Sequence, residues 1–145
     1  NFDASFHAAT RTGGWGVLAR NAGGEVIMAA AGSLQHMNDA MQAESCAFLK
    51  AIHLAEQLGM GRVIFQTDCL PLQQAMSSSS ADRSSIGVLI REAKFQLQIG
   101  FIEAKLVHQP SHLEIVITQR MCWLPMIVRT SQMANVSGYR GSHWM

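Results

Sequence analysis

The order of strand-like and helix-like segments restricts the fold of this 145-residue chain more than any other feature of its sequence. Residues 1–7 alternate apolar and polar side chains, as a half-buried strand does, and two further strands are predicted at residues 15–20 and 25–34. The hairpin turn Asn21-Ala22-Gly23-Gly24 joins the last two, because Asn and Gly tolerate the positive φ of such turns. The three segments therefore predict an antiparallel meander.

Helices enter after this meander. An apolar stripe predicts a long helix that Asn38 or Asp39 can cap and that ends at Leu58, before Gly59. The remaining segments are a strand, a short helix, a longer helix and a fifth strand, at residues 62–66, 70–76, 86–98 and 101–107. A strand–helix–strand stretch after a meander predicts an α/β fold, with a mixed five-stranded sheet and helices on its faces.

Composition excludes several classes of protein. With 48% hydrophobic and 14% charged residues the chain can bury a core, and disorder is not expected. No apolar run approaches the roughly 20 residues that cross a bilayer, and no basic-then-apolar leader marks secretion. Cys46, Cys69 and Cys122 are odd in number and lack C-x-x-C spacing, which argues against a disulfide framework or a zinc site. We expect an intracellular protein of the cytoplasm or nucleus, with no membrane partner.

The charge of the chain argues against tight binding of nucleic acid by a strongly basic surface. Up to Pro110 there are eight Lys and Arg against nine Asp and Glu, which gives a net charge of −1. If three of these acids held divalent cations, the surface around them would become positive and would attract phosphates weakly.

Three acidic residues stand where this architecture would bring them together. Asp3 lies on the first strand, Glu44 lies in the apolar stripe of the long helix, and Asp68 follows the fourth strand, where α/β sheets place ligands. Each also has an ordinary explanation. Asp3 can be a solvated residue on an outer strand face, Glu44 can extend to solvent or complement the helix dipole, and Asp68 can cap the next helix.

Taken together, the three carboxylates indicate a metal site. Like charges that converge on one point destabilise a fold unless they are protonated or bridged by a cation. Oxygen ligands with open positions suit Mg²⁺ or Mn²⁺. Two such ions ~4 Å apart can activate a water and stabilise the departing oxygen of a phosphodiester.

Four motifs in the same part of the chain carry a family resemblance. They are Asn1-Phe2-Asp3-Ala4-Ser5-Phe6, Gly13-Gly14-Trp15-Gly16-Val17-Leu18-Ala19-Arg20, Ala43-Glu44-Ser45-Cys46-Ala47 and Gln66-Thr67-Asp68-Cys69. In order and spacing, over residues 1–110, they resemble the plant branch of the ribonuclease H type 1 family, which is known largely from retrotransposon-derived genes and stand-alone domains. No single motif is decisive, but the ordered set is specific.

The resemblance implies a ribonuclease H-like fold and a function. Asp3, Glu44 and Asp68 match the family's first three metal-ligating carboxylates, which with two Mg²⁺ or Mn²⁺ ions cleave the RNA strand of an RNA–DNA hybrid. His108 lies near the position of a mobile histidine thought to assist product release, although a histidine at a strand end is more often an ordinary surface residue. We expect a monomer that binds an RNA–DNA hybrid or another nucleic acid, and no partner protein can be inferred.

The match ends after the fifth strand. The family continues with Arg-x-x-Asn-x-x-Ala-(Asp or His)-x-Leu-Ala on a last helix, whose Asp is a fourth metal ligand. This chain instead continues with Ser111–Arg120 and a methionine-rich tail. Back-translation of Met121-Cys122-Trp123-Leu124, taken one base earlier, gives Val-Leu-Ala, so we interpret the tail as the product of a frame slip or a misjudged gene boundary.

The sequence thus predicts that the chain consists of two parts. Residues 1–110 form a ribonuclease H-like domain whose first strand is truncated at its start, and residues 111–145 form an irregular tail, so that the family's final helix is missing. Without the fourth carboxylate, two alternatives to an active hybrid ribonuclease stay open. They are a catalytically inactive nucleic-acid-binding module and a decayed retroelement fragment.

Overall fold

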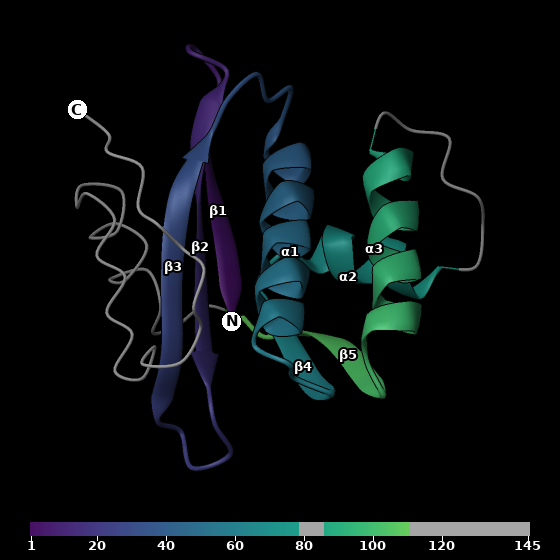
Figure 1. The fold of residues 1–145 in the computed structure, drawn as a ribbon. Helices are drawn as coiled ribbons and strands as arrows, with labels where there is room; N and C mark the ends of the chain where they lie inside the picture. Colours follow the sequence, from purple (N-terminus) through teal and green to yellow (C-terminus); the bar gives the residue numbers. More distant parts are fainter. Residues whose placement is uncertain (79–85, 111–145) are drawn as a thin grey trace.

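The structure is a computed structural model that describes residues 1–78 and 86–110. Its elements follow the predicted order (Figure 1) and are β1 (Phe2–His7), β2 (Thr12–Arg20), β3 (Val26–Leu34), α1 (Ala40–Gln57), β4 (Arg62–Thr67), α2 (Leu70–Ser77), α3 (Gly87–Gly100) and β5 (Glu103–His108). The α/β fold and the order of its elements are confirmed. The largest difference is in β2, which begins at Thr12 rather than Trp15. The predicted tail at 111–145 and the missing last helix lie outside the described residues.

The strands form two hydrogen-bonded sheets within the described ranges, where the sequence had predicted one five-stranded sheet. β1, β2 and β3 pair antiparallel in that order. β4 pairs with β5 in parallel, with Arg62 opposite Glu103 and Thr67 opposite His108. β1 also contacts β4, so the two sheets adjoin along this pair of strands.

Side-chain contacts occupy one backbone donor on the edge of β1 that faces β4. The amino group of Asn1 and the backbone N–H of Leu18 each donate to the carbonyl of the other residue, both at 2.8 Å. Along β1, the peptide groups that face β2 therefore alternate with peptide groups that face β4. The N–H of Ala4 belongs to the second set. It lies 2.8 Å from Oδ1 of Asp3 and 3.3 Å from Oε1 of Glu44. Carboxylates therefore accept the hydrogen bond that a ladder with β4 would use.

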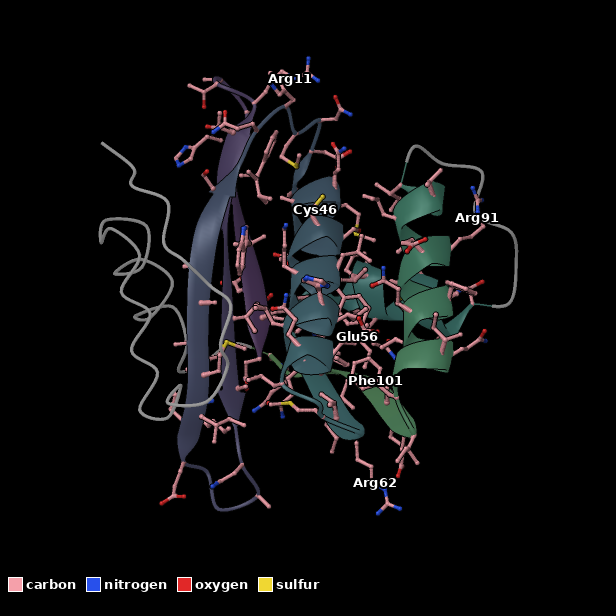
Figure 2. All side chains as sticks on the ribbon, viewed as in Figure 1. Arg11, Cys46, Glu56, Arg62, Arg91 and Phe101 are labelled. Carbon is pink, nitrogen blue, oxygen red and sulfur yellow. The ribbon has the colours of Figure 1, made fainter. Side chains whose placement is uncertain are left out.

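The long helix α1 forms the centre of the core. It lies between the antiparallel sheet and α3 (Figure 1) and contacts both. Its fully buried Phe48 stacks on Phe2 at 4.9 Å between ring centroids and meets Phe65 of β4 edge-on at 5.4 Å. Phe101, labelled in Figure 2, adds an edge contact to Phe65 at 5.8 Å, so one aromatic row connects the two sheets. Neither α1 nor any other helix of the described ranges is long and apolar enough to cross a membrane.

Of the two predicted caps of α1, the structure selects Asp39, which we expect to stabilise the helix by about 1 kcal/mol. Its carboxylate accepts a 2.7 Å hydrogen bond from the backbone N–H of Gln42. The variant Asp39→Ala should lower the free energy of unfolding by ~1 kcal/mol in urea denaturation. Asp39→Asn, which can still accept the bond, should change it by only a few tenths. Equal losses in both variants would mean that the cap is not what Asp39 contributes.

Candidate metal centre

Three elements bring the predicted carboxylates together. Asp3 comes from β1, Glu44 from the second turn of α1, and Asp68 from the position directly after β4. Each offers a carboxylate oxygen, and these oxygens all lie within 4.8 Å of one another. A cation with oxygen ligands at about 2.0–2.6 Å can bridge oxygens up to about 5 Å apart. The convergence expected from the sequence is thus present in the structure, while the role of the three residues as ligands stays a prediction.

Two of the ordinary explanations of these acids do not fit the structure. Asp68 does not cap α2, because the N-cap is Cys69 and the helix has no side-chain cap. Glu44 does not extend to solvent, since its Oε2 is buried. Asp3 is half-buried, and its Oδ1 accepts the N–H of Ala4.

Hydrogen bonds satisfy only one of the two carboxylate oxygens of Glu44. Its Oε1 accepts the N–H of Ala4 at 3.3 Å, but its Oε2 is buried and has no hydrogen-bond partner. A buried acceptor without a partner costs about 1–3 kcal/mol, and more when it is charged. A cation between this oxygen and the other two carboxylates would supply the missing partner. The donor set, all hard oxygen, fits Mg²⁺ or Mn²⁺.

Burial and like charges also shift the titration of Glu44. Burial, which contributes most, and the negative charges of Asp3 and Asp68 together raise the pKa of Glu44 from 4.5 to about 8. The N–H of Ala4 lowers the pKa, but it does not offset burial. In the absence of a cation, Glu44 is therefore largely protonated at neutral pH. A divalent cation at the cluster would reverse this, because it favours the ionised form.

Local hydrogen bonds fix the turn that carries Asp68. The hydroxyl of Thr67 accepts the N–H of Cys69 at 3.1 Å, and the carbonyl of Asp68 accepts the N–H of Leu70 at 3.1 Å. The Asp68 side chain itself is exposed, so the cluster is open to solvent on this side.

His108 lies beside the same turn, as the last residue of β5 rather than a residue after it. It pairs with Thr67 in the parallel register, and its Nε2 lies 3.1 Å from the carbonyl oxygen of Asp68. With a proton on Nε2, the ring donates to that carbonyl. His108 is therefore next to the cluster, but it is not one of the three residues whose oxygens converge.

The backbone contribution to this centre could not be predicted from the sequence. The N–H of Ala4 orients two of the three carboxylates, and one of them comes from a residue 40 positions away. Every residue except proline carries such a donor, so no residue type marks it. The only available signal was its place directly after Asp3 on the first predicted strand.

Comparison with protein families identifies one matching model. The family described as reverse transcriptase-like matches residues 1–113, more than three-quarters of the chain. A comparison with curated proteins gives no match.

Several solved structures share the fold. A ribonuclease H1 from the archaeon Halobacterium salinarum NRC-1 is 16% identical, with a TM-score of 0.68 over 82% of this chain and 86% of its own. The N-terminal ribonuclease H domain of a Mycobacterium tuberculosis protein is 15% identical, with a TM-score of 0.70 over 82% and 85%. LC11 ribonuclease H1, isolated from compost and solved with an RNA/DNA hybrid, is 14% identical, with a TM-score of 0.67 over 82% and 86%. At these identities the similarity shows the fold, which is that of ribonuclease H.

Proposed function

The chain belongs to the reverse transcriptase-like family, and from this membership and its ribonuclease H fold we propose that it cleaves the RNA strand of RNA–DNA hybrids with divalent cations. The observation that carries the proposal is the buried Oε2 of Glu44, which has no partner and belongs to a cluster with Asp3 and Asp68. A cation held by the three carboxylates would give this oxygen a partner and offset the cost of burying it.

The residues that would hold Mg²⁺ or Mn²⁺ are Asp3, Glu44 and Asp68. When bound, such cations supply the Lewis acidity that activates a water for attack on the phosphodiester and stabilises the oxygen that leaves. The exposed carboxylate of Asp68 marks the side on which the cluster is open, and therefore the side from which a phosphodiester would approach.

The chain's own groups prepare this site. The N–H of Ala4 holds the carboxylates of Asp3 and Glu44 in one orientation, so that neither has to be ordered when substrate binds. The hydrogen bond from His108 to the Asp68 carbonyl ties the end of β5 to the turn beside the cluster. This places His108 beside the cluster, where the resemblance implies a histidine that assists product release.

The proposed partner is nucleic acid. The LC11 ribonuclease H1 structure contains an RNA/DNA hybrid, and that enzyme shares this fold. The near-neutral charge of residues 1–110 predicts that hybrid binding by this chain is weak and depends strongly on the cations at the cluster.

The direct test is cleavage of a hybrid with a labelled RNA strand. We expect cleavage in Mg²⁺ or Mn²⁺, loss of cleavage in excess EDTA, and no cleavage of a DNA duplex or an RNA duplex of the same sequence. A preparation that binds the hybrid but does not cleave it with either ion would contradict the enzymatic proposal and support the binding-module alternative. Failure to bind or cleave the hybrid would contradict both.

A further inference from the structure

β3 is the outermost strand of the antiparallel sheet (Figure 1), and its outer edge meets no other strand in the part of the chain that the structure describes. An unpaired edge presents backbone N–H and C=O groups that can bind a further strand, and proteins usually block it with charged residues, proline, a bulge or a short strand. β3 has nine residues, and none of them is charged or proline. Its one irregularity lies at its start, opposite Ala19 and Arg20, so the register is continuous from Met28 to Leu34.

The pairing within the sheet identifies which backbone groups of β3 face this edge. Leu18 of β2 exchanges its backbone hydrogen bonds with β1, so the neighbouring Val17 directs its own groups to Ala30 of β3. Along β3 the groups then alternate between β2 and the outer edge. The residues that direct both their N–H and their C=O outwards are therefore Ala29, Ala31 and Ser33.

The sequence of β3 is compatible with pairing to itself. When two copies pair antiparallel about a two-fold axis at Ala30, residues equally far before and after Ala30 lie opposite one another. A larger side chain then meets a smaller one, with Met28 opposite Gly32. No like charges meet, since Glu25, the charged residue nearest to the axis, lies opposite Gln35.

We propose that β3 binds the β3 of a second copy of this chain, antiparallel and with the two-fold axis at Ala30. The outward groups of Ala29 in one copy then face those of Ala31 in the other, so a hydrogen-bonded pair lies on each side of the axis. The two three-stranded sheets become one continuous sheet. A single pair of strands is a small interface, so the dimer is weak and reversible. It replaces the monomer expected from the sequence.

The competing occupant of the edge is an extended segment of another protein or of the same chain. A second copy is favoured because its β3 is already an ordered strand, whereas a segment that becomes ordered on binding pays for that order. The dimer also leaves the carboxylate cluster open. β2 lies between β3 and β1, and β1 is the strand that contacts β4, so the cluster and the free edge are at opposite ends of the antiparallel sheet.

Cross-linking of the full chain tests the register. In the proposed dimer the two copies of Ala30 form a non-hydrogen-bonded pair with Cα atoms ~4.5 Å apart, which suits a disulfide. Ala30→Cys should therefore give a covalent dimer with oxidised glutathione. Ser33→Cys should not, because its two copies would lie about 20 Å apart along the strands. The unmodified chain, which has three cysteines of its own, is the control for other disulfides.

Paired charge substitutions test the contact without a cross-link. The side chains of Ala29 and Ala31 point away from α1, because the alternate residue Met28 belongs to the core, so charges there should leave the melting temperature unchanged. Ala29→Lys combined with Ala31→Lys places lysine directly opposite lysine and should weaken dimerisation at least ~tenfold in analytical ultracentrifugation. The corresponding double glutamate variant should do the same. An equimolar mixture of the two should form a heterodimer at least ~tenfold tighter than either homodimer.

Amide exchange shows whether the edge itself is covered. The N–H groups of Ala29 and Ala31 should exchange faster on dilution, as the dimer dissociates, whereas the N–H of Ala30, which faces β2, should not. A purely monomeric protein at ~1 mM, where a weak dimer should form, would overturn the proposal. So would equal cross-linking of both cysteine variants, or unchanged dimerisation of the double lysine variant. Protection of Ala29 and Ala31 in a monomer would instead assign the edge to a segment of the same chain. None of these readouts depends on cleavage, so the result is independent of the proposed function.

Discussion

Replacing Asp3 with asparagine should reduce hybrid cleavage by more than ~100-fold and leave hybrid binding intact. Loss of a residue that only orients a metal ligand typically costs 10–100-fold, so loss of a ligand should cost more. Asparagine has nearly the same shape as aspartate, and its side-chain oxygen can still accept the N–H of Ala4. The fold is therefore expected to persist. Because one negative charge is removed from the cluster, binding of the hybrid's phosphates should be unchanged or tighter.

Asp39→Asn is the matched control for this variant. It makes the same chemical change at an exposed helix cap, outside the three-carboxylate cluster. Cleavage of a labelled hybrid and binding of the same hybrid should be measured for both variants. If Asp3→Asn retained cleavage within tenfold of the unmodified chain, Asp3 would not be a metal ligand.

The second large effect is on stability, and it depends on pH and metal together. Without divalent cations, the free energy of unfolding should fall as pH rises from about 5 to 8, by about 2–4 kcal/mol. The folded pKa of Glu44, about 8, lies above its unfolded value, so the folded state holds the proton more tightly in this interval. That contribution is complete below the unfolded pKa and is lost as pH passes through the folded one.

Mg²⁺ should counter this loss. At 100 times its dissociation constant it adds ~2.7 kcal/mol by mass action, and the gain should be larger at pH 8 than at pH 6, where it must displace the proton of Glu44. Urea denaturation at both pH values, with EDTA or millimolar Mg²⁺, measures each quantity. The variant Glu44→Gln should flatten the pH dependence and remove most of the Mg²⁺ effect. Coincident curves with and without Mg²⁺ at pH 8 would mean that the cluster binds no cation.

The parts of the fold that could be predicted are those that depend on residues close together in the sequence. Asp39 and Gly59 mark the two ends of α1, and the Asn21 turn separates β2 from β3, because caps and turns depend on residues a few positions apart. The division of the strands into two sheets could not be predicted, because no local pattern encodes how strands far apart in the sequence pair with one another.

The candidate site, like the fold, could be predicted only in part from the sequence. The positions of Asp3, Glu44 and Asp68 on their elements were sufficient to predict that they converge. The missing partner of one Glu44 oxygen and its raised pKa were not predictable, because both depend on how completely neighbouring side chains exclude water. A cavity of about 500 Å³ lined by Arg62 to Gln66 of β4 could not be predicted either, because it lies between strands far apart in the sequence.

The backbone donor of Ala4 has a consequence for how this site can evolve. Natural selection acts on side chains, but here the group that orients two carboxylates belongs to the main chain. Any substitution that fits the core at position 4 leaves the donor in place, and only proline removes it. An alanine scan would leave the position unchanged, because it already holds alanine. A sequence alignment would suggest only a packing role for this residue. Part of the site is thereby protected from mutational drift, in a fold shared by chains only 14–16% identical.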